Sequence, residues 1–169
     1  MIETQNLILR RPEARDIDAI VTFFMSPRAV SLGGPFALGP AWRIGATVLG
    51  HWAIRGFGLF AVTRKTDDRT IGLIGPWYPI DWPETELGWT ILADDLEGQG
   101  VAFEAAQASR DFAFDVLKWS TAVSYIKSAN ARSIALAERL GAKVDPTAAL
   151  PASFTEIPHV VYRHPRTRP

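Results

Sequence analysis

The segment from Glu86 to Ala105 constrains the fold of this chain more than any other part of the sequence. It reads ELGWTILADDLEGQGVAFEA, an apolar run that leads into a glycine-containing loop and then into a helical pattern. From Val101 onward, apolar residues recur in steps of three and four, which is the period of an amphipathic helix. Gly98 and Gly100 carry no side chain, so a ligand can approach the backbone there. The segment predicts a strand, a loop open to a ligand, and a helix.

The start of that helix is suited to bind an anion. The first-turn N–H groups of a helix lack an intrahelical partner and lie at the positive end of the helix dipole. After a glycine loop they form a phosphate site. A tight turn without a ligand explains Gly-x-Gly alone equally well. The loop is not the dinucleotide fingerprint, which needs a third glycine, and it lacks the lysine of a P-loop.

The rest of the chain predicts a mixed α and β fold in a single domain, 1–169. Short apolar runs bounded by turn residues predict strands, and apolar residues three or four apart predict helices. The predicted strands cover 6–10, 59–64, 70–77, 84–92, 121–126 and 159–164, and the predicted helices cover 13–25, 40–55, 101–116 and 130–140. In the second helix, Trp42, Ala46 and Leu49 share one face, and we expect Trp42 in the core.

Composition excludes several classes of function. Eighteen basic and eighteen acidic residues cancel, so charge gives no case for binding nucleic acid or a membrane. The chain has no cysteine, which excludes a disulfide framework, a thiolate metal site and a cysteine nucleophile. No cluster of acidic residues and histidines has metal-ligand spacing. No apolar run reaches the length of a membrane span or forms a signal peptide, so a cytoplasmic protein is the default expectation.

Several segments resemble the GNAT superfamily of N-acetyltransferases, nearest to the branch that includes the ribosomal-protein N-terminal acetyltransferases. EGQGVA at 97–102 is similar to the motif A loop, Gln/Arg-x-x-Gly-x-Gly/Ala. NARS at 130–133, followed by LGA at 140–142, resembles motif B. TQNLILR at 4–10, with Asp16 beyond, resembles the opening of that branch. Glu97 departs from motif A, and we expect its carboxylate to turn away from a bound pyrophosphate.

The resemblance implies a fold, a cosubstrate and a set of binding residues. The implied fold is a mostly antiparallel twisted sheet of about six to seven strands with about four helices, splayed at an acetyl-CoA cleft. The implied cosubstrate is acetyl-CoA, without a metal. The residues implied to bind it are Ile91, Leu92, Gly98, Gln99, Gly100, Val101, Ala102, Asn130 and Ser133.

Transfer of an acetyl group to a primary amine makes three chemical demands. The amine must lose a proton, the thioester oxygen gains negative charge and needs N–H donors, and the leaving thiolate benefits from a proton. The resemblance implies that Glu86 is the general base, acting directly or through water; a surface glutamate paired with an arginine is the alternative. It also implies backbone N–H donors near Leu92. No covalent nucleophile is needed.

Asn130 and Ser133 are the candidates at the cofactor arm. Asn130 is a favoured helix N-cap, and the resemblance adds a hydrogen bond toward the cofactor. Many family members carry a tyrosine acid seven residues after this asparagine, where this chain has Ala137. The departure leaves Ser133, or a water molecule, to hydrogen-bond the thiolate, so Ser133 is the second candidate catalytic residue.

Two functions follow as hypotheses. The first is an acetyl-CoA-dependent N-acetyltransferase, acting on a protein N-terminus or a small-molecule amine as a monomer or homodimer. The alternative is an acyl-CoA-binding sensor or degenerate GNAT module without efficient turnover. Glu86 and Ser133 favour the enzyme, whereas Ala137 and Glu97 favour the alternative. The segment 26–36 and the link that contains Trp82 are candidates to face the acceptor, although the link equally suits a surface flap or an oligomer contact.

Overall fold

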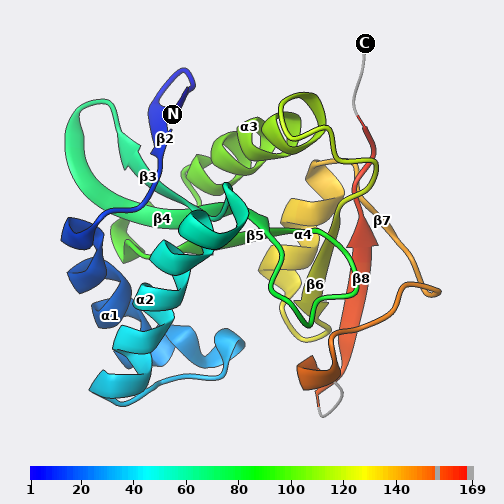
Figure 1. Ribbon diagram of the computed structural model, residues 1–169, viewed down its shortest axis with the longest axis horizontal. Helices are drawn as coiled ribbons and strands as arrows, with labels where there is room; N and C mark the ends of the chain where they lie inside the picture. Colours follow the sequence, from blue (N-terminus) through cyan, green and yellow to red (C-terminus); the bar gives the residue numbers. More distant parts are fainter. Residues whose placement is uncertain (155–156, 167–169) are drawn as a thin grey trace.

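The computed structural model describes residues 1–154 and 157–166, and within them eight strands form one open sheet (Figure 1). The strand order is β1-β2-β3-β4-β5-β6-β8-β7. The strands are β1 (Ile2–Glu3), β2 (Leu7–Arg10), β3 (Phe60–Arg64), β4 (Asp67–Trp77), β5 (Glu86–Ile91), β6 (Val123–Lys127), β7 (Lys143–Val144) and β8 (His159–Arg163). The α-helices are α1 (Ile17–Met25), α2 (Leu38–Arg55), α3 (Val101–Asp115) and α4 (Ala131–Arg139). Short 3₁₀ helices are η1 (Ala14–Asp16), η2 (Pro27–Leu32), η3 (Asp94–Leu96) and η4 (Ala152–Phe154).

The sheet is antiparallel except at one place. Only β5 and β6 run parallel, and their register holds a single pair, Glu86 with Val123. In contrast, β4 and β5 stay paired from Trp77–Glu86 to Gly72–Ile91. The two parallel strands therefore separate beyond Glu86, which confirms the predicted antiparallel sheet with a splay. The described residues hold two more short strands than the sequence pattern predicts, because β1 and β7 have only two residues each and show no periodicity.

The helices cover the two faces of the sheet. Successive residues of a strand point to opposite faces. Leu73 packs against the α1 and α2 side, whereas Ile74 packs against the α3 side. The cluster under α1 and α2 consists of Ile20, Phe23, Phe24, Ala29, Ala41, Val48, Leu73 and Leu92. α4 packs on β6 and β8 through Ala137, which contacts Ile126 and Tyr162.

The helix α2 buries a different face from the predicted one. Its buried positions are Ala41, Gly45, Val48 and His51, whereas Trp42 is 55% exposed. The expectation that Trp42 lies in the core was therefore wrong. The physical reason is close packing against α1, because a Cβ atom at Gly45 would come within 2.9 Å of a methyl group of Ile17. The small-residue face of α2 allows this approach, and the face with the indole ring does not.

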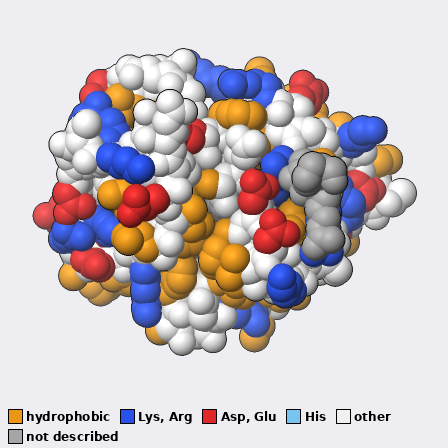
Figure 2. Space-filling model, turned by 90° about the horizontal axis from the view of Figure 1, so that it is seen from above, with side chains coloured by type: hydrophobic (Ala, Val, Ile, Leu, Met, Phe, Trp, Pro, Cys, Tyr) orange, Lys and Arg blue, Asp and Glu red, His pale blue; other side chains and the backbone are white. Residues whose placement is uncertain are grey.

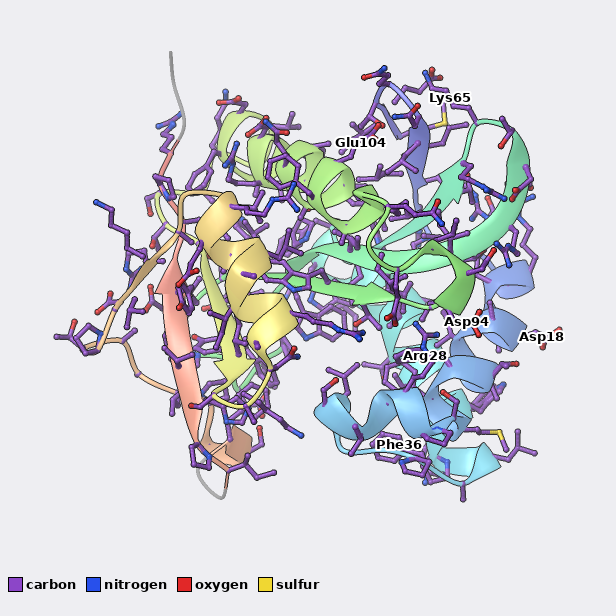
Figure 3. All side chains as sticks on the ribbon, turned by 180° about the vertical axis from the view of Figure 1, so that it is seen from behind. Asp18, Arg28, Phe36, Lys65, Asp94 and Glu104 are labelled. Carbon is purple, nitrogen blue, oxygen red and sulfur yellow. The ribbon has the colours of Figure 1, made fainter. Side chains whose placement is uncertain are left out.

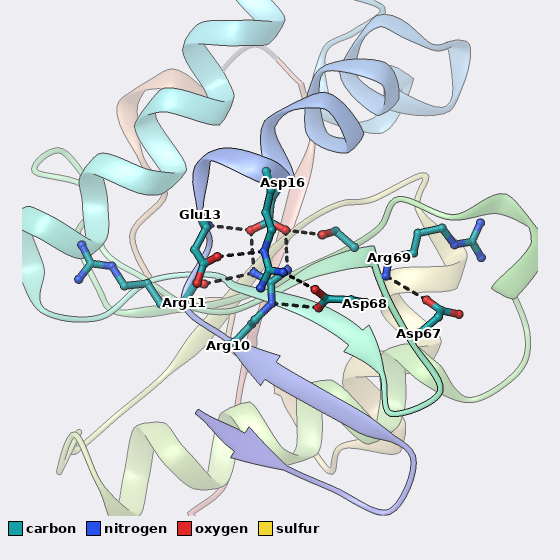
Figure 4. Close-up of polar contacts among 9 residues, drawn as sticks. Arg10, Arg11, Glu13, Asp16, Asp67, Asp68 and Arg69 are labelled. Atoms are coloured by element: carbon teal, nitrogen blue, oxygen red, sulfur yellow. Dashed lines mark hydrogen bonds and ion pairs between the residues drawn. The ribbon is translucent and has the colours of Figure 1, made fainter.

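A buried ion-pair network fixes the N-terminal segment to the sheet (Figure 4). Asp16 is 1% exposed, and its two carboxylate oxygens accept from the Arg10 guanidinium at 2.8 Å each. The same carboxylate accepts from the Glu13 amide and from the Thr70 hydroxyl. Burial alone would raise the pKa of Asp16, but the hydrogen bonds from Arg10, Thr70 and the Glu13 amide outweigh it and hold the pKa below its usual value.

The first turn of α3 is tied to the same N-terminal segment. The Glu104 carboxylate accepts from the Thr4 hydroxyl at 2.5 Å and from the Asn6 backbone amide at 2.8 Å. The two family-like segments of the sequence, residues 4–10 and the start of α3, therefore meet in space. Their hydrogen bonds hold the start of α3, and hence the end of the loop before it, against the N-terminal segment.

The described part of the chain contains no helix that is long and apolar enough to cross a membrane. Nor do its residues include a group of three or more potential metal-ligating side chains. Figure 2 shows basic and acidic side chains interspersed over the face seen from above, so this face presents no field of one sign.

Candidate functional site

A cleft of about 1470 Å³ opens where β5 and β6 separate. One wall comes from α1, η2 and α2, and the other comes from the loop before α3, from α4 and from β6. The cleft therefore passes through the plane of the sheet. Of the residues expected to bind the cosubstrate, those that line it are Ile91, Gly98, Gly100, Val101, Ala102, Asn130 and Ser133.

A side-chain hydrogen bond ends the pairing of β5 with β6. The Val123 amide donates to the Thr85 carbonyl at 3.0 Å, as in a parallel ladder. The next acceptor in that ladder, the Leu87 carbonyl, instead accepts from the Ser124 hydroxyl at 2.6 Å. His164 Nε2 lies 2.9 Å from the same hydroxyl. Because a side chain takes the acceptor that the backbone of β6 would use, the strands part at this residue.

The glycine loop before α3 leaves room for a phosphate. Gly98 and Gly100 have φ angles of +77° and +82°, in the left-handed region that favours glycine. A Cβ atom at either position would meet nothing within 4 Å. The Glu104 amide donates to the Gly100 carbonyl, so the amides of residues 101–103 precede the first bond inside the helix. The open space and these N–H groups suit a phosphate group.

Two polar residues of the same loop turn to protein partners. The Glu97 carboxylate accepts from Arg28 at 2.8 Å and from Arg132, and the hydrogen bond from Arg28 holds the pKa of Glu97 below its usual value. Its charge is thus shared by two guanidinium groups. The Gln99 side chain donates to the Asp95 carbonyl at 2.7 Å and does not line the cleft. Its backbone amide donates to the Leu96 carbonyl at 3.4 Å, so the expected contact of Gln99 with the cosubstrate stays a prediction.

Glu86 lies in the cleft at the start of the splay. Its carboxylate accepts from the Trp82 indole N–H at 2.6 Å. Burial raises its pKa to about 7, although the hydrogen bonds from Trp82 and from the Tyr125 amide lower it. Among the described residues no arginine pairs with Glu86, whereas Glu84, two residues before it, pairs with Arg163. The arginine partner of the alternative is not found among the described residues, and the role of Glu86 as a base stays a prediction.

Asn130 and Ser133 lie on the other side of the sheet from Glu86. Asn130 Oδ1 accepts from the Ser133 amide at 3.2 Å, so the asparagine caps α4. The Ser133 hydroxyl accepts from the Trp89 indole N–H at 3.2 Å, and Trp89 is an odd number of residues from Glu86 along β5. Ala137 is fully buried against the sheet and does not face the cleft. A tyrosine at that position would therefore have no room to reach the cosubstrate.

The end of β5 differs from the expectation. Leu92 is buried, and its amide donates to the Ile71 carbonyl at 2.9 Å, so the sheet already uses this N–H group. Arg28 reaches up from η2 to the same point, where it donates to the carbonyls of Ile91 and Leu92 (Figure 3). Because antiparallel pairing alternates, the amides of Ile91 and Trp89 lie on the side of β5 that faces the splay.

A family model described as an acetyltransferase (GNAT) domain matches residues 6–143. The chain belongs to the GNAT acetyltransferase family. An acetyltransferase from Agrobacterium tumefaciens is 36% identical, with a TM-score of 0.89, and the match covers 98% of this chain and 94% of that one. The family uses acetyl-CoA as cosubstrate, and N-acetyltransferase activity, the first of the two sequence-based hypotheses, is confirmed at this level.

Two further structures share the fold at lower identity. A GNAT-family acetyltransferase from Bordetella pertussis is 20% identical with a TM-score of 0.80, over 97% of this chain and 98% of that one. A structure described as a ribosomal-protein-serine acetyltransferase from Vibrio cholerae is 23% identical with a TM-score of 0.74, over 97% of each chain. These two matches show that the fold is shared.

Sequence reasoning missed three residues that shape the cleft of this GNAT acetyltransferase. Trp82 and Trp89 hold the candidate catalytic side chains through their indole N–H groups, and Arg28 bridges η2 to β5. Trp82 had one available signal, since it precedes Glu86 by four residues in the link already considered near the acceptor. Arg28 lies in the segment 26–36, which is also a candidate to face the acceptor, but its partners at the end of β5 could not be found because they lie more than sixty residues away in the sequence.

Proposed function

We propose that this GNAT acetyltransferase transfers the acetyl group of acetyl-CoA to a primary amine by direct attack, with Glu86 as the general base. The observation that carries the proposal is the environment of Glu86. It is a carboxylate that lines the cleft at the splay, its pKa is raised by burial to about 7, and the described residues give it no ion-pair partner. A general base is most effective when its pKa lies near the working pH. Residues 1–169 act as one catalytic domain in this proposal.

The cosubstrate would lie along the splay. The backbone of Gly98 and Gly100 and the amides at the start of α3 would hold its pyrophosphate. Ile91 and Ser133 would flank the arm that leads to the reacting group, with Asn130 keeping the first turn of α4 in place. When bound, acetyl-CoA supplies a thioester carbonyl to the amine.

Residues on the two sides of β5 would handle the proton and the charge. Glu86 takes the proton of the amine, directly or through water, while the bond from nitrogen to the acetyl carbon forms and the carbon–sulfur bond breaks. The amides of Trp89 and Ile91 would donate to the carbonyl oxygen. The Ser133 hydroxyl accepts from the Trp89 indole, so its own proton is free to donate to the departing sulfur.

A negative charge placed at Gly100 tests whether the loop before α3 binds the pyrophosphate. Gly100→Glu should abolish acetyl-CoA binding in isothermal calorimetry, because its side chain would enter the open space and repel the pyrophosphate. Gly100→Ala is the matched control, since it has the same strained φ at a cost of about 1–2 kcal/mol but adds no charge. The control should bind within about tenfold of the parent. A folded Gly100→Glu variant with unchanged affinity would refute the assignment.

Turnover separates the enzyme from the acyl-CoA sensor that the sequence left open. The assay is release of free thiol from acetyl-CoA in the presence of a panel of primary amines. The enzyme predicts amine-dependent release that falls in Glu86→Gln. Tight acetyl-CoA binding without any amine-dependent release would support the sensor.

A further inference from the structure

The acceptor must reach Glu86 from the face of the sheet that α1, η2 and α2 cover. Leu87 packs against α3, so the adjacent Glu86 points to the opposite face. The cosubstrate loop and Ser133 occupy the α3 and α4 side. The part of the cleft beside Glu86 on the first face is therefore the space left for the acceptor.

Aromatic rings surround that space. The Trp82 indole that donates to Glu86 also packs edge to face on Tyr125 and on Phe154, with ring centres 6.5 Å and 5.3 Å away. Tyr125 and Phe154 contact each other at 6.0 Å, so the three rings form one continuous wall. The facing wall from α1, from the loop between η2 and α2, and from β4 adds the rings of Phe23, Phe24, Phe36 and Trp77.

The lining of the cleft has more positively than negatively charged side chains. Two carboxylates line it, and one of them, Glu97, is neutralised by two arginines. Glu86 is thus the only lining carboxylate without a cation partner among the described residues. The lining on the acceptor side includes Arg43 and Lys127, and the described residues supply neither with a carboxylate within ion-pair distance. A second ammonium group on the acceptor would meet cations and no free acid.

Two contacts limit the length of the space. Lys127 Nζ donates to the Val30 carbonyl at 3.3 Å, which ties the end of β6 to η2. Arg28 donates from η2 to the Ile91 carbonyl at 3.0 Å, which ties η2 to the end of β5. Both contacts join η2 to the splayed strands at residues that line the cleft or adjoin its lining, so they narrow the acceptor side there, which favours a small molecule over an extended chain.

We propose that the acceptor of this enzyme is a small aromatic primary amine that carries no second positive charge. The proposal rests on the proposed function and adds the chemical class of the acceptor. The ring of the amine packs in the aromatic wall of Trp82, Tyr125 and Phe154, and its amino group lies against Glu86. Burial of one aromatic ring removes roughly 150–250 Å² of surface from water, which is enough to favour it strongly over a short alkyl amine.

Three amines test the proposal with single differences. Benzylamine and methylamine differ by the ring, and benzylamine and 4-(aminomethyl)benzylamine differ by a second ammonium group. Rates of thiol release are compared at equal concentrations of the species with one neutral amino group, which for the diamine is the monocation. We expect kcat/KM for benzylamine to exceed that for methylamine by about 10²-fold. The diamine should fall about tenfold or more below benzylamine, because its second charge lies near Arg43 or Lys127.

A pair of ring deletions tests the location. Phe154→Leu removes a ring of the wall, whereas Phe112→Leu removes a ring that packs on Phe60 beneath α3. The first should lower the ratio of benzylamine to methylamine turnover by about fivefold to tenfold, and the second should leave the ratio unchanged. Equal use of methylamine, preference for the diamine, or a ratio unmoved by Phe154→Leu would each overturn the proposal.

Binding measurements keep this test separate from the proposed function. Benzylamine binding to the protein saturated with coenzyme A is followed by saturation-transfer NMR, with the diamine as competitor. Acetylation of a non-aromatic amine alone would overturn the acceptor class and leave the acetyltransferase function intact. Benzylamine bound in the cleft without any acetyl transfer would overturn the function and support the acceptor class. A peptide with an N-terminal phenylalanine, if preferred over benzylamine, would replace the small molecule with a protein N-terminus.

Discussion

Asp16 is a buried carboxylate and Glu86 is a half-buried one, and their surroundings differ strongly. Asp16 receives a bidentate ion pair from Arg10 and further hydrogen bonds from a hydroxyl and an amide, and its pKa is lowered. Glu86 accepts hydrogen bonds from the Trp82 indole and the Tyr125 amide and has no cationic partner among the described residues. Burial raises its pKa to about 7. Desolvation disfavours the charged form of both carboxylates. Only at Asp16 do the ion pair and the hydrogen bonds outweigh this cost.

The difference separates scaffold from chemistry. A buried charge whose hydrogen-bonding capacity is filled by protein groups stays ionised and fixes the elements around it. A buried carboxylate with an incomplete set of partners titrates near neutral pH and is available to take a proton from a substrate. The following experiments test that contrast, beginning with the largest expected effect.

Removal of Asp16 should mainly cost stability. Asp16→Ala leaves the Arg10 guanidinium without its buried partner and should lower the free energy of unfolding in urea by about 3–5 kcal/mol. Asp18→Ala, at an exposed position of α1 two residues further on, should change it by less than about 0.5 kcal/mol. The acetyl-CoA affinity of the folded protein should stay at the parent value. A loss of stability as small as that of the control would show that the network adds no stability.

Removal of the charge at Glu86 should mainly reduce turnover rather than stability. Glu86→Gln keeps the shape of the side chain and loses basicity, so turnover should fall by about 10²-fold while acetyl-CoA affinity is kept. The neighbouring Glu84→Gln is the control, because Glu84 pairs with Arg163 and should affect stability more than turnover. Equal rates for Glu86→Gln and the parent at every pH would reduce Glu86 to a strand residue.

The pH dependence of stability should differ in sign between the two carboxylates. The pKa of Glu86 rises from 4.5 to about 7 on folding, so Glu86 contributes most stability below pH 4.5 and loses it as the pH rises toward 7. Asp16 has a lowered pKa, so its contribution is present above its ordinary value of 3.8 and is lost as the pH falls. Urea unfolding from pH 4 to 8 should therefore show the parent losing stability relative to Glu86→Gln between pH 4.5 and 7.

Activity should increase over the pH range in which the stability contribution of Glu86 decreases, because both depend on the ionisation of Glu86. Only the ionised carboxylate of Glu86 can accept a proton, so kcat/KM should rise with pH through about 7 and this step should vanish in Glu86→Gln. A step that persists in the variant would assign the titration to another group.

The smallest effect is expected at Ser133. Ser133→Ala removes the hydroxyl that we place against the leaving sulfur, and turnover should fall about tenfold, or about 1.4 kcal/mol. Ser109→Ala is the matched control, since its hydroxyl is buried under α3 away from the cleft. Should a structure with bound coenzyme A place the Ser133 hydroxyl far from the sulfur, with no bridging water, another donor must fill the role.

Much of the fold could be predicted because its signals are local. The glycine pair before α3 needs positive φ angles whatever surrounds it, and the Asn130 side chain caps α4 with groups three residues apart. The order of strands and helices followed from periodicity along the chain. Two-residue strands carry no such period, so β1 and β7 could not be found.

Within the candidate site, sequence determined the residue types and tertiary structure decided their roles. The glutamate at position 86 is visible in the sequence, but its raised pKa depends on Trp82 and on the absence of a cation, which the splay and the pairing of Arg163 with Glu84 decide. The sequence makes the Leu92 amide a reasonable oxyanion donor, but in the structure this amide donates to the Ile71 carbonyl of β4.

The helix α2 shows the same division. Two rows of residues in its sequence have helical spacing, one with Trp42 and one with Gly45, and periodicity gives them equal weight. Only the approach of Ile17 selects the row with small side chains. Local patterns thus determine which backbone forms, because they act within one turn or one strand. Which face is buried, and which carboxylate keeps its charge, depends on atoms that come from distant parts of the chain, and tertiary structure alone brings them together.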